Sequence, residues 1–171
     1  GSIITFENEV LTIDNSNVQN KKITEEYAGK LRASYYFMGS LIGKYHEAEI
    51  AYPGGCVIGS RPINYHIESF KKMGINVKNV ADHYIMKTDE LKGNEFYFDF
   101  PSVGATINIM LAAILAKGKT IIYNAAKEPE IANVASFLNS MGAKISGAVL
   151  PSAKVAAIII FSVAPTDGKS K

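Results

Sequence analysis

The stretch Met73-Gly74-Ile75-Asn76-Val77 is matched 68 residues later by Met141-Gly142-Ala143-Lys144-Ile145. Each copy follows a segment with apolar residues at three- and four-residue steps, which predicts a helix that stops at the glycine. A recurrence of this length indicates two copies of one supersecondary unit. We interpret the unit as strand–helix–strand–helix–strand–strand. One unit cannot bury its own helices, so the copies should share a core in an α/β (α+β) fold.

The remaining elements follow from periodicity and from turn residues. An alternating opening segment over residues 4–13 predicts a β-hairpin. Helices are expected over Glu25–Ile42, ended by Gly43, and then from Pro62 to Met73, from Val103 to about Lys117, and from Pro129 to Met141. Strands are expected at 47–51, 76–80, 83–86, 95–98 and 120–123, and from Lys144 onward. When the two copies are aligned at an offset of 68, residues 48–50 align with residues 116–118. The strands that precede the repeated helices therefore align only if a small gap is introduced.

A second echo runs at an offset of 50 residues. Pro101-Ser102 is matched by Pro151-Ser152, and Gly118-Lys119 by Gly168-Lys169. We interpret the apolar stretch between Pro151-Ser152 and Gly168-Lys169 as helix-like, as is the stretch between Pro101-Ser102 and Gly118-Lys119.

Composition excludes several classes of function. The chain has 171 residues and a formal net charge of +2, so there is no broad basic surface for nucleic acid. One cysteine and three histidines make a poor metal set, and the lone thiol is typical of a reducing compartment, the cytoplasm. We expect no secretory signal. We also expect no membrane span, because the most apolar stretch, 155–163, is shorter than the ~20 residues a span needs.

One loop concentrates the chemistry: Pro53-Gly54-Gly55-Cys56-Val57-Ile58-Gly59-Ser60-Arg61-Pro62. Glycine lets backbone N–H groups approach an anion, and an arginine offers a fork of donors to phosphate. A thiol in such surroundings tends toward thiolate or acts as a tuned acid. No cysteine-protease partner lies nearby, so a general acid or an adduct-forming group is favoured over acyl transfer. A loop cysteine without a role, and a surface arginine, are the alternatives.

A second small-residue turn, Ser102-Val103-Gly104-Ala105-Thr106, enters a helix and could hold a diphosphate, although an ordinary helix cap is the alternative. Asn64 and Tyr65, in the first turn after the cysteine loop, could contact a polar ligand or merely cap and pack. The triplet 118–120 is no P-loop, because a strand follows it where a helix is required. No motif for a metal or a cofactor is present, and none is predicted.

Four ordered segments resemble one known family. They are residues 31–36 (LRASYY), 53–62 (PGGCVIGSRP), 100–106 (FPSVGAT) and 124–130 (NAAKEPE). They resemble the UDP-N-acetylglucosamine 1-carboxyvinyltransferases, which are enolpyruvyl transferases of bacterial peptidoglycan synthesis. The similarity runs in order from Leu31 to Gly147. It implies an inside-out α/β barrel built from βαβαββ pseudo-repeats, in agreement with the internal repetition.

The resemblance also implies a reaction and its residues. Enolpyruvyl would pass from phosphoenolpyruvate to the 3′-hydroxyl of UDP-N-acetylglucosamine, by addition and then elimination of phosphate. Cys56 matches the catalytic cysteine, a proton donor, adduct former and target of fosfomycin, and Arg61 matches a phosphate-binding arginine. Arg32 matches an active-site arginine. The implied substrate-binding residues are Arg32, Arg61, Pro62, Ile63, Asn64, Tyr65, Phe100, Pro101, Ser102, Val103, Gly104 and Lys154.

The chain departs from the family in three respects. Asn64 stands where an aspartate is common. The chain is also much shorter than the family, so we expect a single Cys-loop domain over 1–171, without the second domain that carries a catalytic aspartate. Residues 149–171 resemble the family's N-terminal strand and helix, and Lys154 then matches a phosphate-binding lysine of that helix. On this interpretation the chain is permuted, because an N-terminal segment follows the C-terminal one. A shared pseudo-repeat pattern explains that tail equally well.

Three functions remain open from the sequence. The first is a partial enzyme, nearly inactive alone because half of the closed site is missing. The second is a non-catalytic domain that binds nucleotide-sugar or simply folds. The third is an enolpyruvyl transferase of the shikimate type, against which the cysteine loop argues.

Overall fold

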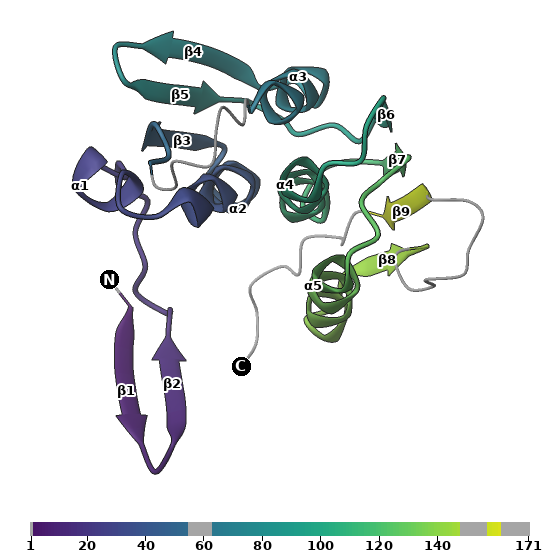
Figure 1. Cartoon of the computed structure of the whole chain (residues 1–171). Helices are drawn as coiled ribbons and strands as arrows, with labels where there is room; N and C mark the ends of the chain where they lie inside the picture. Colours follow the sequence, from purple (N-terminus) through teal and green to yellow (C-terminus); the bar gives the residue numbers. More distant parts are fainter. Residues whose placement is uncertain (1, 55–62, 148–156, 162–171) are drawn as a thin grey trace.

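The computed structural model describes residues 2–54, 63–147 and 157–161. The strands are β1 Ile3–Glu7, β2 Val10–Asp14, β3 Glu47–Ala51, β4 Asn76–Val80, β5 His83–Lys87, β6 Glu95–Tyr97, β7 Lys119–Tyr123, β8 Lys144–Ser146 and β9 Ala157–Phe161. The helices are α1 Glu25–Ala28, the 3-10 turn η1 Arg32–Tyr35, α2 Tyr36–Tyr45, α3 Asn64–Lys72, α4 Val103–Ala113 and α5 Pro129–Ser140. Figure 1 shows α4 between the sheet of β3, β5 and β4 and the sheet of β6 to β9.

Both larger sheets repeat one topology, as the sequence predicts. The orders β3-β5-β4 and β7-β9-β8 match, and in each the last strand of the unit lies in the middle, antiparallel to both neighbours. The register corresponds as well: Glu47 and Asn76 face Lys87, as Lys119 and Lys144 face Phe161. The strands β3 and β7 are therefore offset by 72 residues and β4 and β8 by 68, which accounts for the gap that the alignment required.

Each unit also begins with a segment that pairs in parallel with the following strand. In the second unit β6 pairs with β7, with Phe96 opposite Ile122. In the first unit a single parallel bridge joins Ile23 to Ile50, through hydrogen bonds from Ile23 N to Glu49 O and from Ala51 N to Ile23 O, each 2.9 Å. The two copies are thus both βαβαββ, and the predicted fold class is confirmed.

The core is centred on α4, which is buried along almost its whole length from Gly104 to Ala113. Helices α2, α3 and α5 all pack against it. The closest approach is at α2, where a Cβ added to Gly39 would lie 2.4 Å from the carbonyl oxygen of Asn108. Gly43, expected to end the helix, instead faces Leu111 across the same contact, and α2 continues to Tyr45 before His46 adopts a left-handed conformation (φ 60°).

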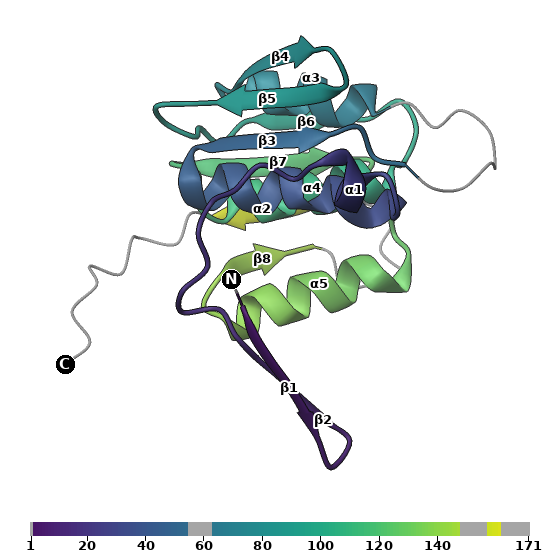
Figure 2. The same cartoon turned by 90° about the vertical axis from the view of Figure 1, so that its left-hand side faces the viewer.

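The hairpin β1–β2 projects away from the layered part of the molecule (Figure 2). It repeats the hairpin β4–β5 at an offset of 73 residues, with five-residue strands, two-residue turns and matching register. One face carries Ile4, Phe6, Leu11 and Ile13, which are 62%, 70%, 57% and 52% exposed. The predicted hairpin is therefore present, and its apolar face is open to solvent.

The helix expected over 25–42 is wrong as one element. It divides into α1, η1 and α2, because Leu31 has extended backbone angles (φ −140°, ψ 118°). In a continuous helix the carbonyl of Ala28 would accept from the N–H of Arg32. Here it accepts from Gly54 N at 3.0 Å and from the Ser34 hydroxyl at 3.1 Å. The chain from β3 therefore takes the hydrogen bond that would continue the helix.

The helix-like interpretation of the second echo is also wrong where the structure describes it. Residues 157–161 form β9, the closing strand of the second unit, with Ile158 and Ile160 buried. β-Branched side chains alternate inward and outward there, as they do in a strand. The echoed residues 151–152 and 168–169 lie outside the described residues.

Candidate functional site

Arg32 begins η1, directly after the break in the helix. Its guanidinium carbon lies 5.7 Å from the centre of the Tyr35 ring, a cation–π distance. The side chain is partly exposed. Because Ala28 O bonds to Gly54 N, the chain before Arg32 is anchored beside the start of the cysteine loop. The segment just before Arg32, the arginine predicted for the active site, thus contacts Gly54, where the described part of the cysteine loop ends.

The other described end of the loop is the start of α3. Ile63 is buried at 8% exposure, and its carbonyl accepts from the N–H groups of His66 and Ile67. Asn64 is exposed. The ring of Tyr65 packs against Phe98, with 5.3 Å between ring centres. Tyr65 therefore packs, as its alternative reading held, while Asn64 is open to solvent.

The turn at Ser102 is a helix cap. The Ser102 hydroxyl accepts from Ala105 N at 3.3 Å, and its backbone is extended, as a residue before a helix requires. Phe100 is 73% exposed, Pro101 is exposed, and Ser102 and Val103 are partly so. At any helix start the first N–H groups have no acceptor within the helix, and an anion is a suitable partner for them.

The segment 124–130 is hydrogen-bonded to the residues on either side of the Ser102 turn. Asn124 has a positive φ of 53° and donates from its amide to Phe98 O at 2.8 Å. Ala126 N donates to the Thr106 hydroxyl at 3.2 Å. The motif thus fixes the strand exit that leads to Phe100 and the first turn of α4.

Three elements, η1, α3 and α4, meet at Gly104. A Cβ added there would lie 2.8 Å from the Tyr35 hydroxyl oxygen and 2.9 Å from Cε1 of His66. A side chain there would displace one of the two rings, so η1, α3 and α4 come together at the N-terminal ends of the two helices. The rings of Tyr35 and His66 meet edge to face, 5.0 Å apart. Arg32, the first turn of α3 and the capped start of α4 therefore belong to one site.

Sequence reasoning missed two residues of this site, His66 and Asn108. His66 is 5% exposed, and Asn108 is fully buried with its amide nitrogen 2.7 Å from Nδ1 of the ring. Burial, and then the positive charge of Arg32, lower the pKa of His66 to about 4. A polar residue in the middle of an apolar helix was the available signal for Asn108.

Cys56, Arg61, Pro62 and Lys154 lie outside the described residues, so the geometry leaves their predicted roles untested. Among residues 2–54, 63–147 and 157–161, no cluster of His, Cys, Asp and Glu could hold a metal ion. Within those same residues no helix is both long enough and apolar enough to cross a membrane.

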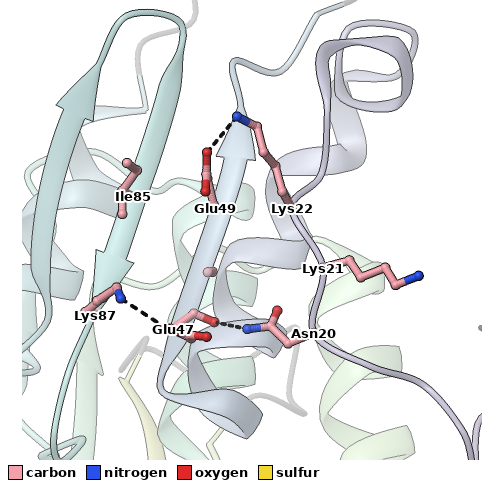
Figure 3. A pocket seen from close by; sticks show the side chains of 8 residues that line it. Asn20, Lys21, Lys22, Glu47, Glu49, Ile85 and Lys87 are labelled. Atoms are coloured by element: carbon pink, nitrogen blue, oxygen red, sulfur yellow. Dashed lines mark hydrogen bonds and ion pairs between the residues drawn. The ribbon is translucent and has the colours of Figure 1, made fainter.

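A separate hollow of about 160 Å³ lies beside β3 (Figure 3). Four of its charged groups form ion pairs, Lys22 with Glu49 at 2.7 Å and Lys87 with Glu47 at 3.3 Å, and Lys21 lines it as well. Asn20 donates to Glu47 O at 3.1 Å. Asn20 Oδ1 is buried there without a hydrogen-bond partner among the described residues. None of the residues that line the hollow belongs to the site around Gly104, so the hollow is separate from the candidate site.

The sequence of this chain matches a family model over residues 1–157. That model describes EPSP synthase (3-phosphoshikimate 1-carboxyvinyltransferase).

Several curated proteins are about 50% identical to this chain. The chain is 52% identical over 146 residues to UDP-N-acetylglucosamine 1-carboxyvinyltransferase 2 of Lactiplantibacillus plantarum, which covers 84% of this chain and 34% of that protein. It is 49% identical over 148 residues to the protein of the same name from Bacillus subtilis, with 86% and 34% covered. It is 51% identical over 149 residues to the UDP-N-acetylglucosamine 1-carboxyvinyltransferase of Halothermothrix orenii, with 86% and 35% covered. The chain thus spans about a third of the length of these relatives.

Solved structures share the fold at low identity. The enolpyruvyl transferase NikO from Streptomyces tendae superposes with a TM-score of 0.76 at 16% identity, covering 96% of this chain and 38% of that one. EPSP synthase from Acinetobacter baumannii gives 0.70 at 15% identity, with 96% and 37% covered. At such identities the likeness establishes the fold alone.

Proposed function

The chain belongs to the EPSP synthase family, and from this membership we propose that it is the cysteine-loop part of a UDP-N-acetylglucosamine enolpyruvyl transferase. Its own role is to bind the nucleotide-sugar and to present the loop acid. The observation that supports the proposal is the meeting of η1, the start of α3 and the start of α4 at Gly104, with the Arg32 guanidinium 5.7 Å from the Tyr35 ring that lies there. The names of relatives at about 50% identity support the choice of sugar substrate.

The chemistry follows from the residue types. Helix N-termini and a guanidinium stabilise the diphosphate of a nucleotide-sugar. Cys56 protonates the methylene carbon of phosphoenolpyruvate as the sugar oxygen adds to the adjacent carbon, and Arg61 binds the phosphate that later leaves. Lys154 is a further phosphate ligand in this proposal. Reaction in the bacterial cytoplasm and alkylation of Cys56 by fosfomycin follow from the same assignment.

Turnover requires the closed site of a longer protein. Because the chain spans about a third of its relatives, the groups that remove the sugar hydroxyl proton are to be sought in the remaining two thirds. We therefore expect binding without efficient turnover. Phosphate release from phosphoenolpyruvate and UDP-N-acetylglucosamine at the rate of a full-length relative would contradict this part.

The binding test is a titration followed by amide shifts. UDP-N-acetylglucosamine should shift the amides of residues 63–65 and 102–106, and shikimate 3-phosphate should shift them far less. Arg32→Ala should weaken binding about tenfold through the lost charged contact. Lys30→Ala removes an exposed cation two residues earlier and should leave the affinity unchanged.

Two results would decide against the proposal. Equal shifts with both ligands would remove the preference for the nucleotide-sugar. An absence of shifts would leave the alternative of a domain that folds without binding it.

A further inference from the structure

Asn108 connects three elements through one buried side chain. Its Oδ1 accepts from Gly39 N of α2 at 2.9 Å, and its Nδ2 donates to Tyr35 O of η1 at 3.1 Å. The same Nδ2 lies 2.7 Å from Nδ1 of His66 on α3. A carboxamide has two N–H donors and one acceptor oxygen, and here each donor and the oxygen has a partner. A satisfied buried network of this kind fixes one arrangement of the elements that it joins.

The partners determine which way the amide points. A backbone N–H can only donate and a backbone carbonyl can only accept, so the oxygen must face Gly39 and the NH₂ group must face Tyr35. The group that faces His66 is then a donor. Nδ1 of His66 must accept, and the neutral ring carries its proton on Nε2. A protonated ring would set two donors against each other, which agrees with the lowered pKa of His66.

Two of the elements that Asn108 joins, η1 and α3, form the candidate site together with its own helix, α4. Tyr35 follows Arg32 in η1, and its ring lies between the guanidinium and the imidazole at 5.7 Å and 5.0 Å. His66 follows Asn64 and Tyr65 in the first turn of α3. Asn108 itself is one turn beyond Gly104 on α4. Moving its amide would therefore move Arg32 and the start of α3 relative to the start of α4.

We propose that Asn108 is a positioning residue of the nucleotide-sugar site, which holds η1 and α3 against α4 and keeps His66 in the tautomer protonated on Nε2. The inference rests on the proposed function for its ligand. Asn108 is too buried to contact a ligand, and it acts through Tyr35 and His66.

The test replaces the donor while keeping the size. Asn108→Asp cannot donate to Tyr35 O, and its carboxylate requires a proton on Nδ1 of His66. Nitrogen-15 spectra of the imidazole at pH 7 should show an unprotonated Nδ1 in the wild type and a protonated Nδ1 in the variant. Affinity for UDP-N-acetylglucosamine should fall about tenfold or more, as displacement of binding groups by about 1 Å implies.

Asn139→Asp is the matched control. The Asn139 amide on α5 is part-buried, donates to Ile145 O and accepts from Ile145 N, and it lies outside the segments assigned to the site. This variant should lose stability but retain the wild-type tautomer and affinity. If Asn108→Asp does not fold, Asn108→Ser replaces it, because a hydroxyl supplies one donor where the amide supplied two.

The outcomes separate the inference from the proposed function. A wild-type ring protonated on Nδ1 at pH 7, or a folded Asn108→Asp variant that binds as tightly as the wild type, would overturn the role of Asn108. A wild type that does not bind UDP-N-acetylglucosamine would instead overturn the proposed function, while the tautomer measurement would still judge the hydrogen-bond assignment.

Discussion

At the scale of single residues, His66 links the site to pH. Its ring is buried, neutral and hydrogen-bonded by Asn108, and its pKa is lowered to about 4 from an ordinary value of 6.5. The unfolded chain takes up the proton at a higher pH than the folded chain does. Protonation therefore favours unfolding, and stability falls as the pH drops from about 6.5 through 4.

We expect this one group to remove about 3 kcal/mol of the free energy of unfolding between pH 7 and pH 4. Denaturant unfolding at a series of pH values measures it. His66→Gln keeps an acceptor for the Asn108 amide and has no proton to gain, so the pH dependence in this window should be smaller in the variant. Equal slopes in the two proteins would show that other groups cause the effect.

At the scale of elements, the contact between α2 and α4 sets the spacing on which the site depends. Gly39 lies against the backbone of Asn108, and backbone atoms cannot move aside as a side-chain end can. Its N–H also holds the Asn108 amide. The glycine therefore has both a packing role and a positioning role.

Gly39→Ala should lower the free energy of unfolding by more than about 2 kcal/mol, because the new methyl group forces the helices apart. Thermal or urea unfolding measures the loss. Ser40→Ala changes the next residue of α2, whose hydroxyl bonds only to Phe37 O among the described contacts, and should stay within about 0.5 kcal/mol of the wild type. Similar losses in both variants would mean that the close contact does not control stability.

How far the sequence predicts these elements depends on the range of the forces. The offset between Met73 and Met141 identified the repeat, because both copies follow local periodicity. The cap at Ser102 was also predictable, since capping is local. The break before Arg32 was not, because it depends on a bond from Gly54, 26 residues away from Ala28. The link between Asn108 and His66 likewise requires the packed helices.

At the scale of the whole molecule, stability is unevenly distributed. The hairpins β1–β2 and β4–β5 share length, turn and register, but they differ in their surroundings. Met86 is fully buried, whereas Ile13, its counterpart in β2, is 52% exposed. An isolated two-stranded hairpin is marginal in water. The ladder hydrogen bonds of β1–β2 should therefore open far more easily than those of β4–β5.

Native-state hydrogen exchange tests this comparison within one sample. Amides in the β1–β2 ladder should exchange by local opening that costs less than about 1 kcal/mol, while those between β3 and β5 should exchange only on global unfolding. The ladder β4–β5 is the internal control, since its geometry is the same. Equal protection of the two hairpins would show that exposure of the apolar face does not lower the free energy of opening the β1–β2 ladder.

The hydrogen bond from Gly54 to Ala28 also bears on the order of folding. Residues 25–42 have a helical pattern of their own, so a continuous helix through residues 29–32 is favoured wherever the chain is not yet packed. That local helix has to be interrupted before Ala28 O is free for Gly54, and the partner arrives only with β3. Arg32 should therefore reach its native place late, after pairing of distant segments. The arginine of the site then reports completion of the fold, and refolding followed at Arg32 should lag behind helix formation.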